Sequence, residues 1–136
     1  MEQAKADAVI RSCVELTAGE ARYLLAIRTL TENGTPPSQA AIARRLGVSG
    51  PTALEMVRRL RKLDLVEPGN LALTSAGMSA ALVLHSRRKA AKQLAHDVLG
   101  LDDAEAEIEA ERLAASASPV LARHLVAWRA ASNARN

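Results

Sequence analysis

The sequence predicts a mainly α-helical protein in which a winged helix-turn-helix domain is followed by a second, all-helical domain. Three observations support this class. Apolar residues recur at helical spacing along most of the chain. Two of these segments are joined at Gly47, and the second begins with a Ser-Gly-Pro start at residues 49–51. Hydrophobic residues make up 49% of the 136 residues but aromatic residues only 1%, which favours close helix packing through Ala, Leu, Val and Ile.

The chain is expected to begin with a helical extension over residues 1–16 that has no strong cap. Thr17 and Glu20 have the spacing of a capping box, so a new helix is expected to begin at Thr17. This helix continues as EARYLLAIRTLTEN. Asn33-Gly34 is expected to end it, and Pro36-Pro37 prevents its continuation.

Residues 38–66 predict the helix-turn-helix. Ser38 can cap the first helix, and Gly47 lies at the sharp turn, where a positive φ is often required. Ser49 can cap the second helix, and Pro51 in its first turn costs no hydrogen bond. The apolar residues of the second helix recur at helical spacing and are expected to face inward; they are Ala53, Val57 and Leu60.

The second of these helices has the properties of a recognition helix that enters the major groove of double-stranded DNA. Small residues at its start allow close approach to DNA, and the cations further along suit phosphate groups. The formal net charge of +3 is compatible with this partner. The side chains expected to face DNA are Gly50, Thr52, Glu55, Arg58, Arg59, Arg61 and Lys62.

The segment after the helix-turn-helix predicts a wing. The turn sequence at residues 67–70 lies between two short apolar runs, which is typical of a minimal β-hairpin. Its tip has no Lys or Arg, so we expect it to contribute little to phosphate binding. Thr74 can cap a long helix, expected over residues 75–99 and ended by Gly100.

Two further helices follow. Asp102 and Glu105 repeat the capping-box spacing, and Ser118-Pro119 begins the last helix. Both helices are too short to enclose a core, so we expect a homodimer that spaces two recognition helices about one DNA turn apart, ~34 Å, on a pseudo-palindromic operator. The expected interface residues are Leu113, Val120, Leu121, Leu125 and Trp128.

These expectations give four parts. Residues 1–16 are the N-terminal extension, and residues 17–74 are the winged helix-turn-helix DNA-binding domain. Residues 75–131 form the long linking helix and the helical dimerisation domain, and residues 132–136 are a frayed tail.

Composition narrows the chemistry further. Cys13 is the only cysteine, which excludes an internal disulfide and a CxxC metal site. The chain has no Gly-rich phosphate loop, GxSxG motif or Cys/His pair, so an enzyme is not expected. No apolar run reaches the roughly 20 residues that span a bilayer, and the N-terminus lacks a signal-peptide hydrophobic region. We therefore expect a cytoplasmic protein with no membrane partner.

Four stretches carry a resemblance to a known family: EARYLLAIRTL, IARRLGVSGPTALEMVRRL, LTSAG and VLGLD. With the order of elements, they resemble the DtxR/MntR family (diphtheria toxin repressor and manganese transport regulator), in a two-domain form without the SH3-like domain. The resemblance covers about Glu20 to Trp128. It implies that DNA is contacted by Ser49, Pro51, Thr52 and Glu55, with Gln39 near a phosphate.

Glu55 stands where the toxin-repressor branch of the family has Gln. A carboxylate repels phosphate but can accept a hydrogen bond from the N4 amino group of cytosine. The target sequence is therefore expected to differ from that of the toxin-repressor branch.

The metal ligands that the resemblance implies are largely replaced. Only two carboxylates remain, and the other side chains are cationic or apolar, whereas Mn²⁺ and Fe²⁺ need several converging oxygen and imidazole donors. Arg stays protonated and cannot ligate. No cofactor is therefore expected. The matching positions are Arg22, Leu25, Arg88, Lys92, Glu107, Glu111, Ala114 and Ala115.

An ionic cluster is one hypothesis for what replaces the metal. In it Arg22, Arg88 and Lys92 point toward Glu107 and Glu111; the alternative is that these are ordinary solvated charges. Three other functions stay open: a metal-responsive regulator with a rearranged site using Glu107, Glu111 and a histidine, a partner protein that modulates another regulator, and a regulator that binds a small organic ligand.

Overall fold

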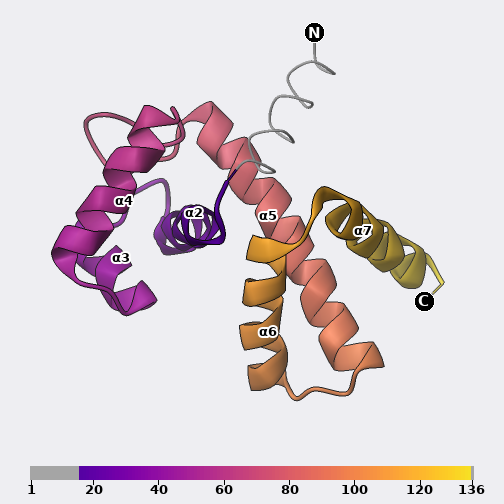
Figure 1. Ribbon diagram of the computed structural model, residues 1–136. Helices are drawn as coiled ribbons and strands as arrows, with labels where there is room; N and C mark the ends of the chain where they lie inside the picture. The colour runs from indigo at the N-terminus through magenta and orange to yellow at the C-terminus, as the bar shows by residue number, and fades with distance from the viewer. Residues whose placement is uncertain (1–15, 136) are drawn as a thin grey trace, which may run out of the picture. The chain divides into compact units, whose positions relative to one another are not determined.

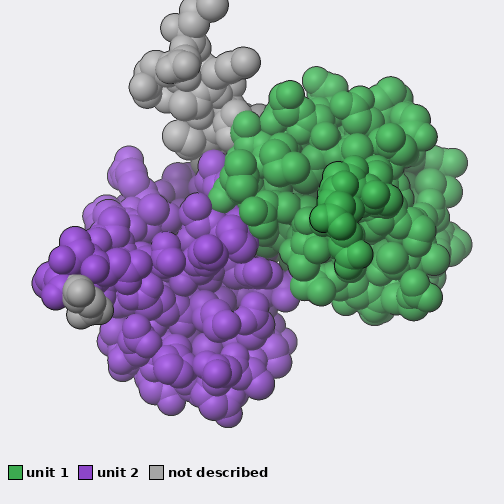
Figure 2. Space-filling model, turned by 180° about the vertical axis from the view of Figure 1, so that it is seen from behind, with its two compact units in different colours: residues 1–82 green, residues 83–136 purple. Residues whose placement is uncertain are grey.

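The computed structural model describes residues 16–135, which form two compact units divided between Leu82 and Val83 (Figures 1 and 2). This part of the chain contains no named strand, only two isolated β-bridges, and none of its helices is both long and apolar enough to cross a membrane. The helices are α2 (Ala18–Leu30), α3 (Gln39–Leu46), α4 (Gly50–Lys62), α5 (Ser75–Gln93), η1 (Leu94–Val98), α6 (Asp103–Ser116) and α7 (Pro119–Ala134).

The predicted extension lies outside the described residues, apart from its last residue, and so does Cys13. The predicted boundary between the two domains was the start of α5. The two compact units divide within this helix, whose first turns pack in the first unit against the segment that leaves α4, and the domain boundary itself stays a prediction.

The capping box at the start of α2 is confirmed. Thr17 Oγ1 accepts a hydrogen bond from the Glu20 backbone N–H at 3.1 Å, and Glu20 Oε1 accepts one from the Thr17 N–H at 2.8 Å. Each residue thus satisfies a backbone donor at the helix end that has no partner within the helix.

The predicted C-terminal end of this helix was wrong. α2 ends at Leu30, and Asn33 and Gly34 have positive φ angles of 50° and 79° between the bridged residues Glu32 and Thr35. Asn-Gly favours tight turns that need a positive φ at both central residues. The pair therefore closes a turn of its own after the helix, instead of capping it.

The helix-turn-helix is formed as predicted, with α3 and α4 lying beside α2 (Figure 1). Ser38 and Ser49 cap α3 and α4 through their side-chain oxygens, and Gly47 ends α3 with a φ of 67°. The three helices enclose the core of the first unit. Its fully buried side chains include Leu24, Ile27, Ile42, Ala53, Val57 and Leu60.

The wing is smaller than the predicted hairpin. It consists of a single bridge between Val66 and Leu73, with a hydrogen bond from the Glu67 N–H to the Ala72 carbonyl oxygen at 2.9 Å. Two other carbonyls of this loop accept hydrogen bonds from a side chain of α4, described below.

Thr74 joins the wing to α5. Its backbone N–H donates to the Leu65 carbonyl oxygen at 3.1 Å, and its hydroxyl donates to the Asp64 carbonyl oxygen at 2.7 Å. The same hydroxyl accepts from the Gly77 N–H at 3.0 Å, as in a helix cap. At Gly77 a Cβ atom would lie 1.9 Å from the Leu65 carbonyl oxygen, so only glycine allows this approach.

The second unit is built from the last turns of α5 together with η1, α6 and α7. The predicted long helix reaches Val98, but it widens into a π-turn in which the Leu99 N–H donates to the Leu94 carbonyl oxygen at 3.1 Å. Most buried residues of this unit are alanines, which let the helices approach closely. They are Ala90, Ala91, Ala95, Ala106, Ala110, Ala114 and Ala122; the other buried residues of this unit are Leu84, Leu125 and the charged Arg87.

Asp102 with Glu105 and Ser118 cap α6 and α7 as predicted. The prediction of a frayed tail from residue 132 differs from the structure, because α7 continues to Ala134. The Gln93 side-chain amide donates to Asn133 Oδ1 at 2.9 Å, which ties the last turn of α7 to α5.

Replacing Gly77 by Ala should lower the free energy of unfolding by about 1–3 kcal/mol, because the new methyl group would overlap a backbone carbonyl that cannot move without displacing the wing. Urea denaturation followed by circular dichroism measures the change. Gly69→Ala is the control, since a Cβ there meets nothing within 4 Å and φ is not positive. Equal midpoints for the two variants would contradict this account of the joint.

Candidate nucleic-acid interface

One face of α4 is buried and the opposite face is exposed. Ala53, Val57 and Leu60 have no exposed surface, because this stripe packs in the core of the first unit. The remaining surface of the helix is available to a partner. The exposed residues are Gly50, Pro51, Thr52, Glu55, Arg58, Arg59 and Lys62, with Ser49 at the cap.

The first turn of α4 is fixed by side chains. Ser49 Oγ accepts from the Thr52 N–H at 3.2 Å and donates to Thr52 Oγ1 at 2.8 Å. The Gln39 side-chain amide donates to the Gly50 carbonyl oxygen at 3.2 Å, which links α3 to the start of α4. The predicted contact of Gln39 with phosphate stays a prediction. Its amide has a second N–H that can still donate.

Arg59 is held by a buried carboxylate. Its Nη2 atom lies 3.3 Å from Glu20 Oε2, and the side chain of Glu20 is 5% exposed whereas that of Arg59 is 56% exposed. The other carboxylate oxygen of Glu20 is the one that caps α2. Glu20 therefore connects the start of α2 to the recognition helix. The capping-box spacing identified Glu20 only as a capping residue, because spacing along the chain carries no information about a partner on another helix.

Arg61 binds the wing. Its Nε donates to the Glu67 carbonyl oxygen at 2.8 Å and its Nη2 donates to the Asn70 carbonyl oxygen at 3.1 Å. These bonds satisfy two loop carbonyls that the short bridge leaves without a backbone partner. The structure thus gives Arg61 a positioning role that the sequence did not reveal.

Three outward side chains of α4 keep their polar groups available. Within residues 16–135, no hydrogen bond or ion pair involves the side chain of Glu55, Arg58 or Lys62. Two cations and one carboxylate are therefore presented on the exposed face. This is the arrangement expected of a helix that meets phosphates at its edges and base edges at its centre.

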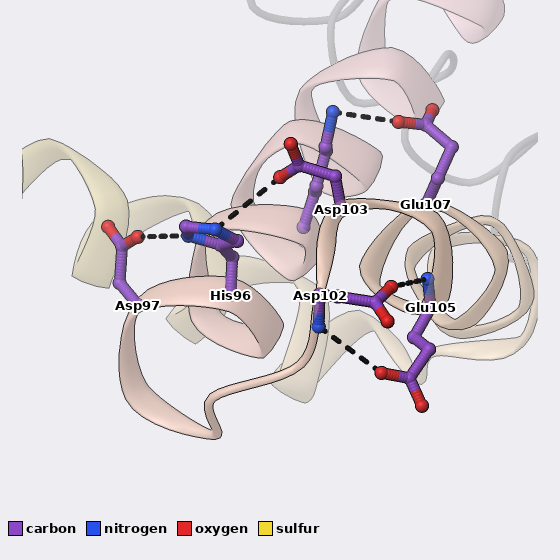
Figure 3. Close-up of polar contacts among 7 residues, drawn as sticks. His96, Asp97, Asp102, Asp103, Glu105 and Glu107 are labelled. Carbon is purple, nitrogen blue, oxygen red and sulfur yellow. Dashed lines mark hydrogen bonds and ion pairs between the residues drawn. The ribbon is translucent and has the colours of Figure 1, made fainter.

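The positions that match the family's metal ligands lie in both units. Leu25 and Ala114 are buried apolar residues, and Arg22 is exposed. In the second unit Lys92 Nζ lies 2.8 Å from Glu107 Oε2, so the predicted pairing of these two residues is present (Figure 3). The hydrogen bond to Glu107 raises the pKa of Lys92, which keeps its ammonium group charged. In the described part of the chain, no group of three or more His, Cys, Asp or Glu side chains could hold an ion.

A second polar cluster lies where η1 meets the start of α6. His96 lies between two carboxylates, with Nδ1 2.9 Å from Asp97 Oδ1 and Nε2 3.4 Å from Asp103 Oδ1 (Figure 3). The hydrogen bond to Asp97 raises the pKa of His96. The bonds from Glu105 lower the pKa of Asp102, the residue that caps α6. The contacts of His96 with Asp97 and Asp103 hold the connection between the two helices and were not predicted from the sequence, whereas the capping pair of Asp102 and Glu105 was.

The predicted dimer-interface residues differ in exposure. Leu125 is buried within the unit, Leu113 and Trp128 are half-buried, and Val120 and Leu121 are 58% and 44% exposed. Further large apolar side chains of the second unit are also exposed. They are Val98, Leu99, Ile108 and Val126.

Comparison with known proteins agrees with this geometry. Residues 15–69 match the family described as iron dependent repressor, N-terminal DNA binding domain. The diphtheria toxin repressor of Corynebacterium glutamicum is 36% identical over 107 residues, covering 76% of this chain and 47% of that protein. The iron-dependent repressor IdeR of Mycobacterium tuberculosis is 35% identical over 115 residues, which cover 82% of this chain and 50% of that protein. The chain spans about half the length of the curated relatives it matches.

Two solved structures share the fold. A manganese-dependent transcriptional repressor in complex with manganese superimposes with a TM-score of 0.70 at 32% identity, covering 79% of this chain and 50% of that one. The manganese regulator SloR superimposes with a TM-score of 0.70 at 28% identity, and the match covers 80% of this chain and 52% of that one. The predicted fold class and the resemblance to the DtxR/MntR family are thereby confirmed, and residues 15–69 form the DNA-binding domain that this family shares.

Proposed function

We propose that this protein is a cytoplasmic transcriptional repressor that binds a pseudo-palindromic DNA operator as a homodimer and does not use metal as its named relatives do. The observation that carries the proposal is α4, a helix that is anchored on one face and presents polar and cationic groups on the other. The relatives are named as repressors, and repressors are not enzymes.

The DNA contact is supported by the way α4 is fixed. Ser49 and Gln39 hold its first turn, and Glu20 holds its last third through Arg59. A helix that does not have to be ordered on binding loses less conformational entropy at the interface. Arg58 and Lys62 are the strongest candidates for phosphate contacts, because their charges are not used within the described residues.

DNA binding without metal is supported by the side chains at the positions that match the family's metal ligands. At the eight positions where the family's ligands are expected, this chain has two guanidinium groups, one ammonium group and three apolar side chains, none of which can coordinate Mn²⁺ or Fe²⁺ at neutral pH, and only two carboxylates. Glu107, one of the two remaining carboxylates, pairs with Lys92. This ion pair joins α5 to α6 with fixed charges in place of a bound cation.

The homodimer is supported by the surface of the second unit. Val120 and Leu121 expose apolar surface on the first turn of α7, and Ile108 is 54% exposed on α6. Large apolar side chains exposed on consecutive helices are candidates for an interface between copies of the chain. A twofold dimer would present two α4 helices to two half-sites of opposite orientation, which is why the operator is expected to be pseudo-palindromic.

Removing Arg58 should weaken binding to all DNA sequences alike, because a phosphate contact carries no sequence information. The slope of log Kobs against log salt should become less steep by about one unit for each lost phosphate contact per DNA site. Fluorescence anisotropy over a salt series measures this for Arg58→Ala. Arg112→Ala removes the same charge from α6 and should leave the slope unchanged; a change as large as that of Arg58→Ala would contradict the assignment.

A charge placed at Val120 should dissociate the homodimer. Val120→Glu would bury a carboxylate without a partner at the proposed interface, which costs several kcal/mol and shifts the equilibrium toward monomer by at least about tenfold. Analytical ultracentrifugation across micromolar concentrations measures the shift. Leu63→Glu is the control, since Leu63 is 50% exposed in the first unit. A wild-type protein that sediments as a monomer would contradict the dimer.

A further inference from the structure

We infer that Glu55 selects the target sequence, by accepting a hydrogen bond from the N4 amino group of a cytosine in each half-site. This inference rests on the proposed function and goes one step further, since it assigns a base preference to one side chain of α4. Three features of Glu55 support it: its position on the helix, the absence of a described partner for its carboxylate, and the cations on either side of it.

The first observation is position. Glu55 lies midway between Ala53 and Val57, two residues with no exposed surface. Two residues correspond to about 200° around an α-helix, so the side chain of Glu55 leaves the helix on the side opposite both. Glu55 is therefore at the centre of the exposed face. When a helix enters a groove with its buried face outward, the central residue is the one nearest the base edges.

The second observation is that the carboxylate is available. No hydrogen bond or ion pair holds it among residues 16–135, although Arg58 and Arg59 follow it at helical spacing. Arg59 is turned instead toward Glu20, whose carboxylate lies 3.3 Å from it. Arg59 therefore does not neutralise the negative charge of Glu55, because its guanidinium pairs with Glu20.

The third observation is the arrangement of charge across the face. Around the helix, Arg58 and Arg59 flank Glu55 on its two sides, and Lys62 lies two turns further along nearly the same line. At the edges of a groove-binding helix cations meet the phosphates of the two backbones, as Arg58 can, and Arg59 keeps 56% of its side chain exposed although it also contacts Glu20. A carboxylate is repelled by the same backbones, so the position that costs least for Glu55 is the floor of the groove.

At the floor of the groove the carboxylate discriminates between bases. An ionised carboxylate only accepts hydrogen bonds. Guanine presents acceptors at O6 and N7 and thymine presents one at O4, whereas cytosine presents a donor at N4. Adenine offers a donor at N6 but has the N7 acceptor beside it. Cytosine is the base whose major-groove edge fits a carboxylate.

The anchored first turn makes this preference specific to one position. Ser49 donates its hydroxyl proton to Thr52 Oγ1, which leaves the proton of Thr52 free to donate outward. Thr52 therefore presents a donor one turn before the acceptor of Glu55. The two residues are expected to act on different bases, so a change at Glu55 should alter one position of the operator and leave the rest.

The test is selection of binding sites from a randomised DNA pool by the full chain, with wild type and Glu55→Gln in parallel. Wild type should enrich a cytosine at one position of each half-site. The side-chain amide of the variant would present a donor and an acceptor, which suit the N7 and N6 atoms of adenine, so the preference at that position should change from cytosine to adenine. Anisotropy titrations with single-base variants should show a preference of about 5- to 150-fold for the matching base.

Two controls test whether a change of base preference comes from the position of Glu55, and not from the loss of one charge or from a loss of stability. Glu109→Gln removes the same charge from the exposed surface of α6 and should enrich the wild-type sequence. Thermal unfolding of Glu55→Gln should match wild type, because the side chain has no partner in the described residues to lose.

The outcomes are distinct. An adenine in place of the cytosine, with the other positions retained, supports the inference. An identical enriched sequence for wild type and Glu55→Gln overturns it while leaving the repressor function intact. A pool with no enrichment by wild type overturns the proposed DNA-binding function, and the inference with it.

Discussion

The orientation of the recognition helix depends on one buried carboxylate. Glu20 closes the capping box of α2 with one oxygen and holds Arg59 of α4 with the other. A carboxylate that is almost fully buried is stable only when it is paired and hydrogen-bonded, so the two interactions need each other. This connection adds to the packing of the buried stripe of α4, and further contacts continue it along the chain: Arg61 of α4 holds the wing, and Thr74 ties the wing to α5.

Elements that depend on local spacing could be predicted from the sequence. The caps at Thr17, Ser49 and Ser118 each need a side chain only three residues from its partner, and all three are present. Features set by tertiary contacts could not be predicted. The pairing of Glu20 with Arg59 joins two helices that lie far apart in the sequence, and the Gly77 approach to Leu65 depends on how α5 returns to the wing.

The outward residues of α4 were also predictable, because their spacing relative to the buried stripe fixes their side of the helix. Which of these residues bind within the protein, and which stay available to a partner, could not be predicted. Arg59 and Arg61 look equivalent to Arg58 in the sequence, but the structure uses the first two within the protein and leaves the third available. At the positions of the family's metal ligands, the charges in the sequence predicted the contact between Lys92 and Glu107 that the structure contains.

The proposed binding of DNA without metal is the part of the function that one binding experiment can decide. Fluorescence anisotropy with the DNA upstream of this protein's own gene tests it most directly, in excess chelator and again with Mn²⁺ or Fe²⁺. We expect sequence-specific binding of equal affinity in both conditions. Binding that occurs only when metal is added would contradict it, and would mean that this chain assembles a metal site from other donors.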